Sequence, residues 1–334
     1  MKLTLASLLL MAAGSVQAQE VLNIYSSRHY DTDERLYSDF EEATGIEIQR
    51  IEGDADELIA RIEAEGRNSP ADILLTVDAS RTWRAEQKGL YQPVESTVLE
   101  QRIPAYLQAP DNTWFGFSQR ARIVFYHKDR VENPPRTYAE LADPAYEGMI
   151  CMRSSSNVYS QTLLAAIIAH DGAEAATDWA EGLKNNLARD PQGGDTDQLR
   201  GLVSGECDIA ISNTYYFGRA IRTDVEGVSA AIDQIDWIFP DQSGNGTHMN
   251  VSTGGVLAHA PNRENAVKFL EYLASDQAQE YFSAGNDEYP AVPGVALSPS
   301  VAEMGYFRSD ALGLGEIAAN APQAQEIYNE VDFR

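Results

Sequence analysis

The sequence predicts an α/β protein with two lobes. Apolar, strand-like runs alternate with helix-like periodicity through most of the chain, as in successive βα units that build a largely parallel sheet. The chain has 334 residues, well above the length of a typical domain, so two domains are expected. Hydrophobic residues make up 43% of it and charged residues 23%, which is the composition of a globular protein rather than a disordered one.

The first part of the chain contains three strand-like runs separated by helical patterns. The strands are expected at residues 21–25, 46–51 and 71–77, and the helices at residues 31–44 and 54–65. The third strand is apolar apart from Asp72, as expected where a sheet is covered on both faces.

A second set of similar units follows. Its strands are expected at residues 122–127, 148–153, 207–212 and 251–258, and its helices at residues 157–170 and 262–282. We expect the chain to cross between the lobes near residues 116–121 and 241–250. Open α/β sheets bind ligands beyond the carboxyl ends of their strands, so a ligand is expected in the cleft between the lobes.

These crossings divide the chain into four segments. We assign residues 19–119 and 247–290 to the N-terminal lobe, and residues 120–246 and 291–334 to the C-terminal lobe.

The first eighteen residues have the pattern of a secretory signal peptide. Lys2 provides the positive start, residues 3–13 are apolar but too few to span a bilayer, and Ala18 ends the segment with a small residue. We expect cleavage after Ala18, and no later segment reaches the roughly 20 apolar residues that a membrane span needs. The mature protein is therefore expected in an exported compartment, most simply the bacterial periplasm.

The charge balance disfavours several classes of partner. With 25 Lys and Arg against 51 Asp and Glu, the formal net charge is −26 at pH 7. A field of this sign repels phosphate backbones and anionic headgroups, so nucleic acids and membrane surfaces are not expected as partners. Cationic ligands are favoured.

Cys151 and Cys207 are the two cysteines of the chain. An even count in an exported protein favours one disulfide, and no His or Cys lies at zinc-finger spacing. The alternative is a pair of buried free thiols.

Three segments at expected strand-to-helix turns carry an unusual set of side chains. They are residues 28–30, with His29 and Tyr30, residues 154–159, which end at Tyr159, and residues 213–216, which contain Tyr215 and Tyr216. The chain has 16 tyrosines, so an adjacent pair could simply place one ring in the core and one at the surface. A turn, however, lets neighbouring side chains converge, whereas a strand sends them to opposite faces.

Several phenols and one imidazole suit a hard, highly charged cation. A trivalent metal lowers the pKa of a phenol enough to deprotonate it, and anionic oxygen donors favour Fe(III) over divalent ions. Four phenolates around Fe(III) leave one net negative charge, which a nearby arginine would offset. The arginines close in sequence to these segments are Arg28, Arg120, Arg122 and Arg219, and the alternative is that they are solvated surface charges.

Enzymatic motifs are poorly represented. The chain has no GxSxG motif, P-loop, HExxH motif or dinucleotide fingerprint at the opening of a βαβ unit. Acidic residues are so numerous that no carboxylate pair can be singled out as a catalytic acid and base.

The same residues resemble a known family, the periplasmic ferric-iron-binding proteins that serve iron ABC transporters, and especially its cyanobacterial-type branch. The similarity covers nearly the whole mature chain. Its motifs lie at residues 23–30, 89–94, 120–126, 151–159 and 205–216.

This resemblance implies a ligand set for Fe(III): His29 and Tyr30 from one lobe, and Tyr159, Tyr215 and Tyr216 from the other. It implies a class II periplasmic-binding-protein fold in which each lobe is a mixed sheet flanked by helices, and it supports the disulfide. The implied partner is an ABC permease of the inner membrane. We expect a monomeric carrier that is not an enzyme and has no organic cofactor.

Two other functions stay open at the level of sequence. A carrier of another cationic solute, such as a polyamine, would need carboxylates and flat aromatic walls. A tyrosinate-metal hydrolase would need an open coordination position and a general base, for which five protein donors leave little room.

Overall fold

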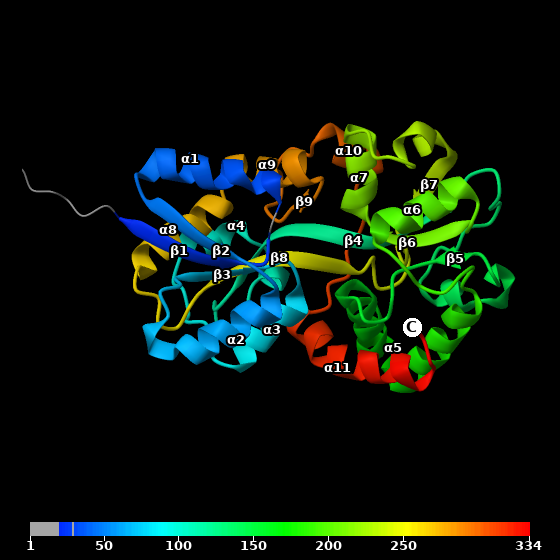
Figure 1. Ribbon diagram of the computed structural model, residues 1–334, viewed down its shortest axis with the longest axis horizontal. Helices are drawn as coiled ribbons and strands as arrows, with labels where there is room; N and C mark the ends of the chain where they lie inside the picture. The colour runs from blue at the N-terminus through cyan, green and yellow to red at the C-terminus, as the bar shows by residue number, and fades with distance from the viewer. Residues whose placement is uncertain (1–19, 29) are drawn as a thin grey trace, which may run out of the picture.

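The computed structural model describes residues 20–28 and 30–334 (Figure 1). The predicted signal peptide and its cleavage site therefore lie outside the described residues, as does His29.

One continuous mixed sheet runs through the described chain in the order β2-β1-β3-β8-β4-β6-β5, with β7 and β9 also paired to β4. The strands are β1 (Val21–Ser26), β2 (Glu47–Glu52), β3 (Ile73–Thr76), β4 (Phe115–His127), β5 (Ile150–Cys151), β6 (Ile209–Asn213), β7 (Ile235–Ile238), β8 (Met249–Val256) and β9 (Tyr289–Pro290). The expectation of a largely parallel sheet is wrong. The long strands β4 and β8 are antiparallel to their neighbours, and each runs from one half of the sheet into the other. Parallel pairing is retained between β1 and β2, β1 and β3, and β5 and β6.

Strands β4 and β8 join the two halves of the molecule and lie side by side through its middle (Figure 1). The first part of β4 pairs with β8, and its second part pairs with β6. The C-terminal part of β8 pairs with β3 on its other edge. The crossing near residues 116–121 therefore falls within a strand, whereas the lobe boundaries stay a prediction.

Helices cover both faces of the sheet (Figure 1). They are α1 (Glu34–Thr44), α2 (Ala55–Glu65), α3 (Ala79–Gln87), α4 (Thr97–Arg102), α5 (Val158–Asn185), α6 (Asp195–Ser204), α7 (Thr214–Arg222), α8 (Arg263–Leu273), α9 (Asp276–Asn286), α10 (Pro299–Met304) and α11 (Leu314–Glu330). A short 3-10 turn, η1 (Asp31–Asp33), precedes α1. None of the described helices has both the length and the apolar character needed to cross a membrane.

The prediction of one helix at residues 262–282 is wrong. This segment forms two helices, α8 and α9, which are separated by a break at residues 274–275. The hydroxyl of Ser275 accepts a hydrogen bond from the backbone N–H of Ala278 at 3.2 Å. Such an N-cap satisfies a backbone N–H that has no partner within the helix, and it therefore marks the start of a new helix. The stripe of apolar side chains continues across this break in the backbone.

The alternation of side chains along β4 gives the strand two different faces. Ile123 and Phe125 belong to one buried cluster and Val124 to another. Because side chains of a strand alternate with a period of two, Arg120 and Arg122 share the face of Val124. Both arginines are buried, with exposed fractions of 0% and 2%.

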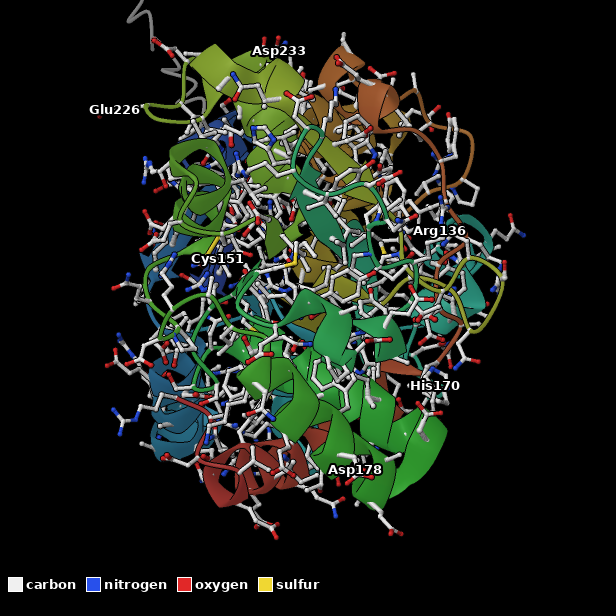
Figure 2. All side chains as sticks on the ribbon, turned by 90° about the vertical axis from the view of Figure 1, so that its right-hand side faces the viewer. Arg136, Cys151, His170, Asp178, Glu226 and Asp233 are labelled. Carbon is white, nitrogen blue, oxygen red and sulfur yellow. A yellow bond between two sulfur atoms is a disulfide. The ribbon has the colours of Figure 1, made fainter. Side chains whose placement is uncertain are left out.

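The predicted disulfide between Cys151 and Cys207 is confirmed (Figure 2). The two Cα atoms are 5.8 Å apart, within the normal range for a disulfide. Gly201 of α6 packs on the bridge, and a Cβ atom at that position would lie 2.7 Å from the sulfur of Cys207. The bridge therefore ties β5 to the segment that leads into β6.

Replacing both cysteines by alanine should lower the free energy of unfolding by about 4 kcal/mol, because the bridge closes a long loop. The sequence separation is 56 residues. Urea denaturation of the variant and of the oxidised parent measures the difference. Equal stability of the two proteins would contradict this expectation.

Candidate functional site

The three tyrosine segments all lie where a strand gives way to a helix, as predicted. Tyr30 follows β1 and precedes η1, Tyr159 is the second residue of α5, and Tyr215 and Tyr216 are the second and third residues of α7. Helix N-termini carry partial positive charge, so α5 and α7 both favour anionic groups at these positions.

Asn157 fixes the start of α5, since its side chain accepts a hydrogen bond from the N–H of Tyr159 at 3.0 Å. The hydroxyl oxygens of Tyr159 and Tyr215 are 3.4 Å apart. The rings of Tyr215 and Tyr216 lie with their centroids 4.2 Å apart and their planes inclined by 31°. Residues that are 56 apart in sequence thus meet through their phenol groups.

Tyr30 belongs to the same electrostatic cluster. Burial raises the pKa of Tyr215 well above its usual value, and the neighbouring phenols of Tyr159, Tyr30 and Tyr216 raise it further. Burial also raises the pKa of Tyr30, together with the charges of Glu288 and Tyr159. The pKa of Tyr216 is raised to about 12, mainly by burial and then by the charge of Asp195. Tyr30, Tyr215 and Tyr216 therefore hold their protons until a cation compensates the charge that deprotonation creates.

Three of the four arginines predicted near the site, Arg28, Arg120 and Arg122, are buried rather than solvated. The guanidinium carbon of Arg120 lies 5.7 Å from the ring centroid of Tyr159, and that of Arg122 lies 5.9 Å from it. Burial lowers the pKa of Arg120, but Tyr159 and Glu288 raise it and prevail, so this group stays charged. Within the described part of the chain, its Nε and Nη2 atoms have no hydrogen-bond partner.

Arg28 and Arg219 contact the remaining rings. The guanidinium carbon of Arg28 lies 5.0 Å from the ring centroid of Tyr30, and that of Arg219 lies 5.9 Å from the rings of both Tyr215 and Tyr216. All four arginines therefore contact at least one of the four phenol rings.

Asp33 is buried and pairs with Arg28 at 2.8 Å. Besides Asp33, three charged residues that the sequence did not single out hold these arginines or contact a ring. Glu288 is 1% exposed and pairs with Arg28 and Arg120, in each case at 3.3 Å. Asp195 pairs with Arg122 and Arg153, and Arg153 lies 5.6 Å from the ring centroid of Tyr159. With 51 acidic residues in the chain, no pattern distinguishes these two carboxylates from surface ones.

Among the residues that the structure describes, the predicted donors that come together here are phenols. Among residues 20–28 and 30–334, no group of three or more His, Cys, Asp or Glu side chains could hold a metal ion. A metal bound at this cluster would have phenolate oxygen ligands, and such ligands favour hard, highly charged ions.

Comparison with known proteins gives close matches. Residues 35–307 match the family of bacterial extracellular solute-binding proteins. The chain is 48% identical over 317 residues to iron uptake protein A1 of Synechocystis sp.. The matched region covers 95% of this chain and 88% of that protein.

Solved structures give the same result. The fold is similar to Trichodesmium IdiA (FutA) in complex with iron and citrate ligands, with 44% identity, a TM-score of 0.90 and coverage of 94% of this chain and 100% of that chain. It is also similar to the ferric binding protein from Campylobacter jejuni, with 41% identity, a TM-score of 0.87 and coverage of 94% and 100%. These matches confirm the predicted two-lobed, class II periplasmic-binding-protein fold.

Replacing Glu288 by Gln should lower the free energy of unfolding by about 3 to 5 kcal/mol, because the buried Arg120 would lose its counter-charge. Arg28 would keep its pairing with Asp33 at 2.8 Å. Urea denaturation of the metal-free protein measures this loss. The matched control is Glu280→Gln in α9, an exposed position where a change within about 0.5 kcal/mol is expected. A Glu288→Gln protein as stable as the control would contradict the assigned pairing.

Proposed function

Because the chain belongs to the family of bacterial extracellular solute-binding proteins, we propose that it captures Fe(III) between its two lobes and delivers it to an ABC permease. The observation that carries the proposal is the convergence of four phenols among buried arginines. The names of the relatives, an iron uptake protein and a ferric binding protein, support the same ion.

The proposed ligands are Tyr30, Tyr159, Tyr215, Tyr216 and His29. Four phenolates around Fe(III) carry one net negative charge, which the arginines that contact the rings offset. The N-termini of α5 and α7 act in the same direction. Ferric iron accepts about six donors, so five protein ligands leave at most one position open.

The remaining parts of the proposal concern place and partners. We propose that the protein works in the periplasm after cleavage behind Ala18, as a monomer without catalytic activity. A hydrolase would need an open coordination position and a general base; five proposed ligands leave at most one position, and the buried Glu288 and Asp195 each pair with two arginines, which supports a carrier.

The pairing of the buried carboxylates favours iron over a polyamine. A polyamine would need free carboxylates to receive its ammonium groups. Glu288 and Asp195 each already pair with two arginines, and the arginines place positive charge against the phenol rings. A cation bound here must therefore create its own negative ligands, which a trivalent metal does by deprotonating phenols.

Adding a ferric salt to the purified protein should produce a visible absorption band from phenolate-to-iron charge transfer, with one iron retained per chain after desalting. The Tyr215→Phe and Tyr216→Phe variants should each weaken the band. Tyr126→Phe is the control, because its hydroxyl pairs with Asp236 and not with the cluster. A wild-type protein that stays colourless and keeps no iron would refute the proposed function.

Iron binding should release protons, one for each phenol that becomes a ligand, so four for the full set. Affinity should therefore fall as the pH falls, by about tenfold per pH unit for each proton displaced. Proton release is measured at constant pH during titration with ferric nitrilotriacetate. Each variant in which a ligand Tyr is replaced by Phe should release one proton fewer than wild type, whereas Tyr126→Phe should release the same number as wild type. Subtracting the wild-type value from each variant's value cancels the protons that come from the iron source. Equal release from all variants would contradict phenolate ligation.

A further inference from the structure

One buried carboxylate connects three segments around the phenols. Asp195 is the first residue of α6 and is 0% exposed. Its Oδ1 atom accepts hydrogen bonds from Nη1 of Arg122 and, at 3.2 Å, from the backbone N–H of Asn213. Its Oδ2 atom accepts one from Nη1 of Arg153 at 2.9 Å. The three donors come from β4, from the turn after β5 and from the end of β6.

Each of these donors lies close to a tyrosine of the cluster, either in space or in sequence. The guanidinium carbons of Arg122 and Arg153 lie 5.9 Å and 5.6 Å from the ring centroid of Tyr159. Asn213 is the N-cap residue of α7, and Tyr215 follows two residues later. Asp195 therefore holds the surroundings of Tyr159 and the start of α7 at the same time.

Within the described part of the chain, the pairing with Asp195 also leaves the hydroxyl of Tyr159 without a hydrogen bond from either guanidinium group. This hydroxyl pairs with that of Tyr215. Both arginines instead donate to Asp195 through Nη1. Among the described residues, the Nε and Nη2 atoms of Arg122 have no hydrogen-bond partner. A phenolate oxygen that accepted hydrogen bonds from guanidinium groups would be a weaker donor to a metal, because the cations would share its charge.

We propose that Asp195 is a positioning residue of the iron site. It keeps Arg122 and Arg153 bound to itself, so that the oxygen of Tyr159 stays available to the metal, and it fixes the Asn213 turn that presents the next two tyrosines. This inference rests on the proposed function, and the experiment distinguishes a protein that does not bind iron from one in which Asp195 does not position the site.

The test compares iron-loaded wild type with Asp195→Asn, Asp195→Glu and Asp197→Asn. Asp197 is the matched control: it lies in the same first turn of α6, accepts a hydrogen bond from the N–H of Gly194 and pairs with Arg200, away from the cluster. The readouts are the energy of the charge-transfer band, the rate of iron loss to excess citrate and the urea midpoint of the metal-free protein.

Asp195→Asn should shift the band to higher energy and lose iron at least tenfold faster, because the freed guanidinium groups lower the energy of the Tyr159 phenolate electrons. Asp195→Glu should recover most of both properties. Asp197→Asn should keep the wild-type band and rate even where its urea midpoint falls.

Arg153→Gln keeps the test decisive if Asp195→Asn does not fold. Arg153 is 22% exposed, so its loss is tolerated more easily, and removing its charge should shift the band to lower energy. A wild-type band and rate in Asp195→Asn, an equal shift in Asp197→Asn, or an unshifted band in Arg153→Gln would each overturn the inference while leaving iron binding intact. A wild-type protein without any band would overturn the proposed function and this inference together.

Discussion

Burial of the guanidinium groups of Arg120 and Arg122 in β4 is the constraint that organises this molecule. A buried charge is tolerated only with a counter-charge and hydrogen bonds, so each arginine requires a carboxylate from elsewhere in the chain. Glu288 reaches Arg120 from the segment before β9, and Asp195 reaches Arg122 from the start of α6. Each carboxylate also holds a second arginine that contacts a tyrosine ring. The tyrosine segments are thereby tied to the strand that joins the two halves of the sheet.

Charge acts in opposite directions at long and short range in this protein. The net charge of −26 attracts cations to the molecule as a whole. At the phenols the sign reverses, because Arg120 lies against Tyr159 and Arg219 lies against Tyr215 and Tyr216. Burial raises the pKa of Tyr215 and Tyr216, while the neighbouring arginines lower it and so favour the deprotonated form that a bound metal would require. A neutral or negative pocket would hold a divalent or organic cation more readily than it would ionise four phenols.

The sequence predicted those parts of the fold that depend on local pattern. The early helices, the three strand-to-helix turns and the strands other than β7 and β9 follow from periodicity, and the cysteine pair follows from count and compartment. The direction of β4 and β8 did not, because pairing between distant strands leaves no local signal. The break at Ser275 was missed because the apolar stripe runs on across it. The convergence of the tyrosines came from the family resemblance, and the carboxylates at 195 and 288 could not be found among so many acidic residues.

The same network connects the proposed ligands of the two halves of the molecule. Ser252 of β8 accepts hydrogen bonds from Arg28 at 2.6 Å and from Arg120 at 3.0 Å, so the Tyr30 segment is anchored directly to the strands that cross between the halves. Tyr159 and Tyr215 are carried by α5 and α7, which lie in the half of the molecule opposite to β1 (Figure 1). A ligand shifts a conformational equilibrium only by the difference in its affinity for the two states. An ion bound by the proposed ligands would take donors from both sides, so it would favour the conformation in which the two sets of phenols meet around the arginines of β4.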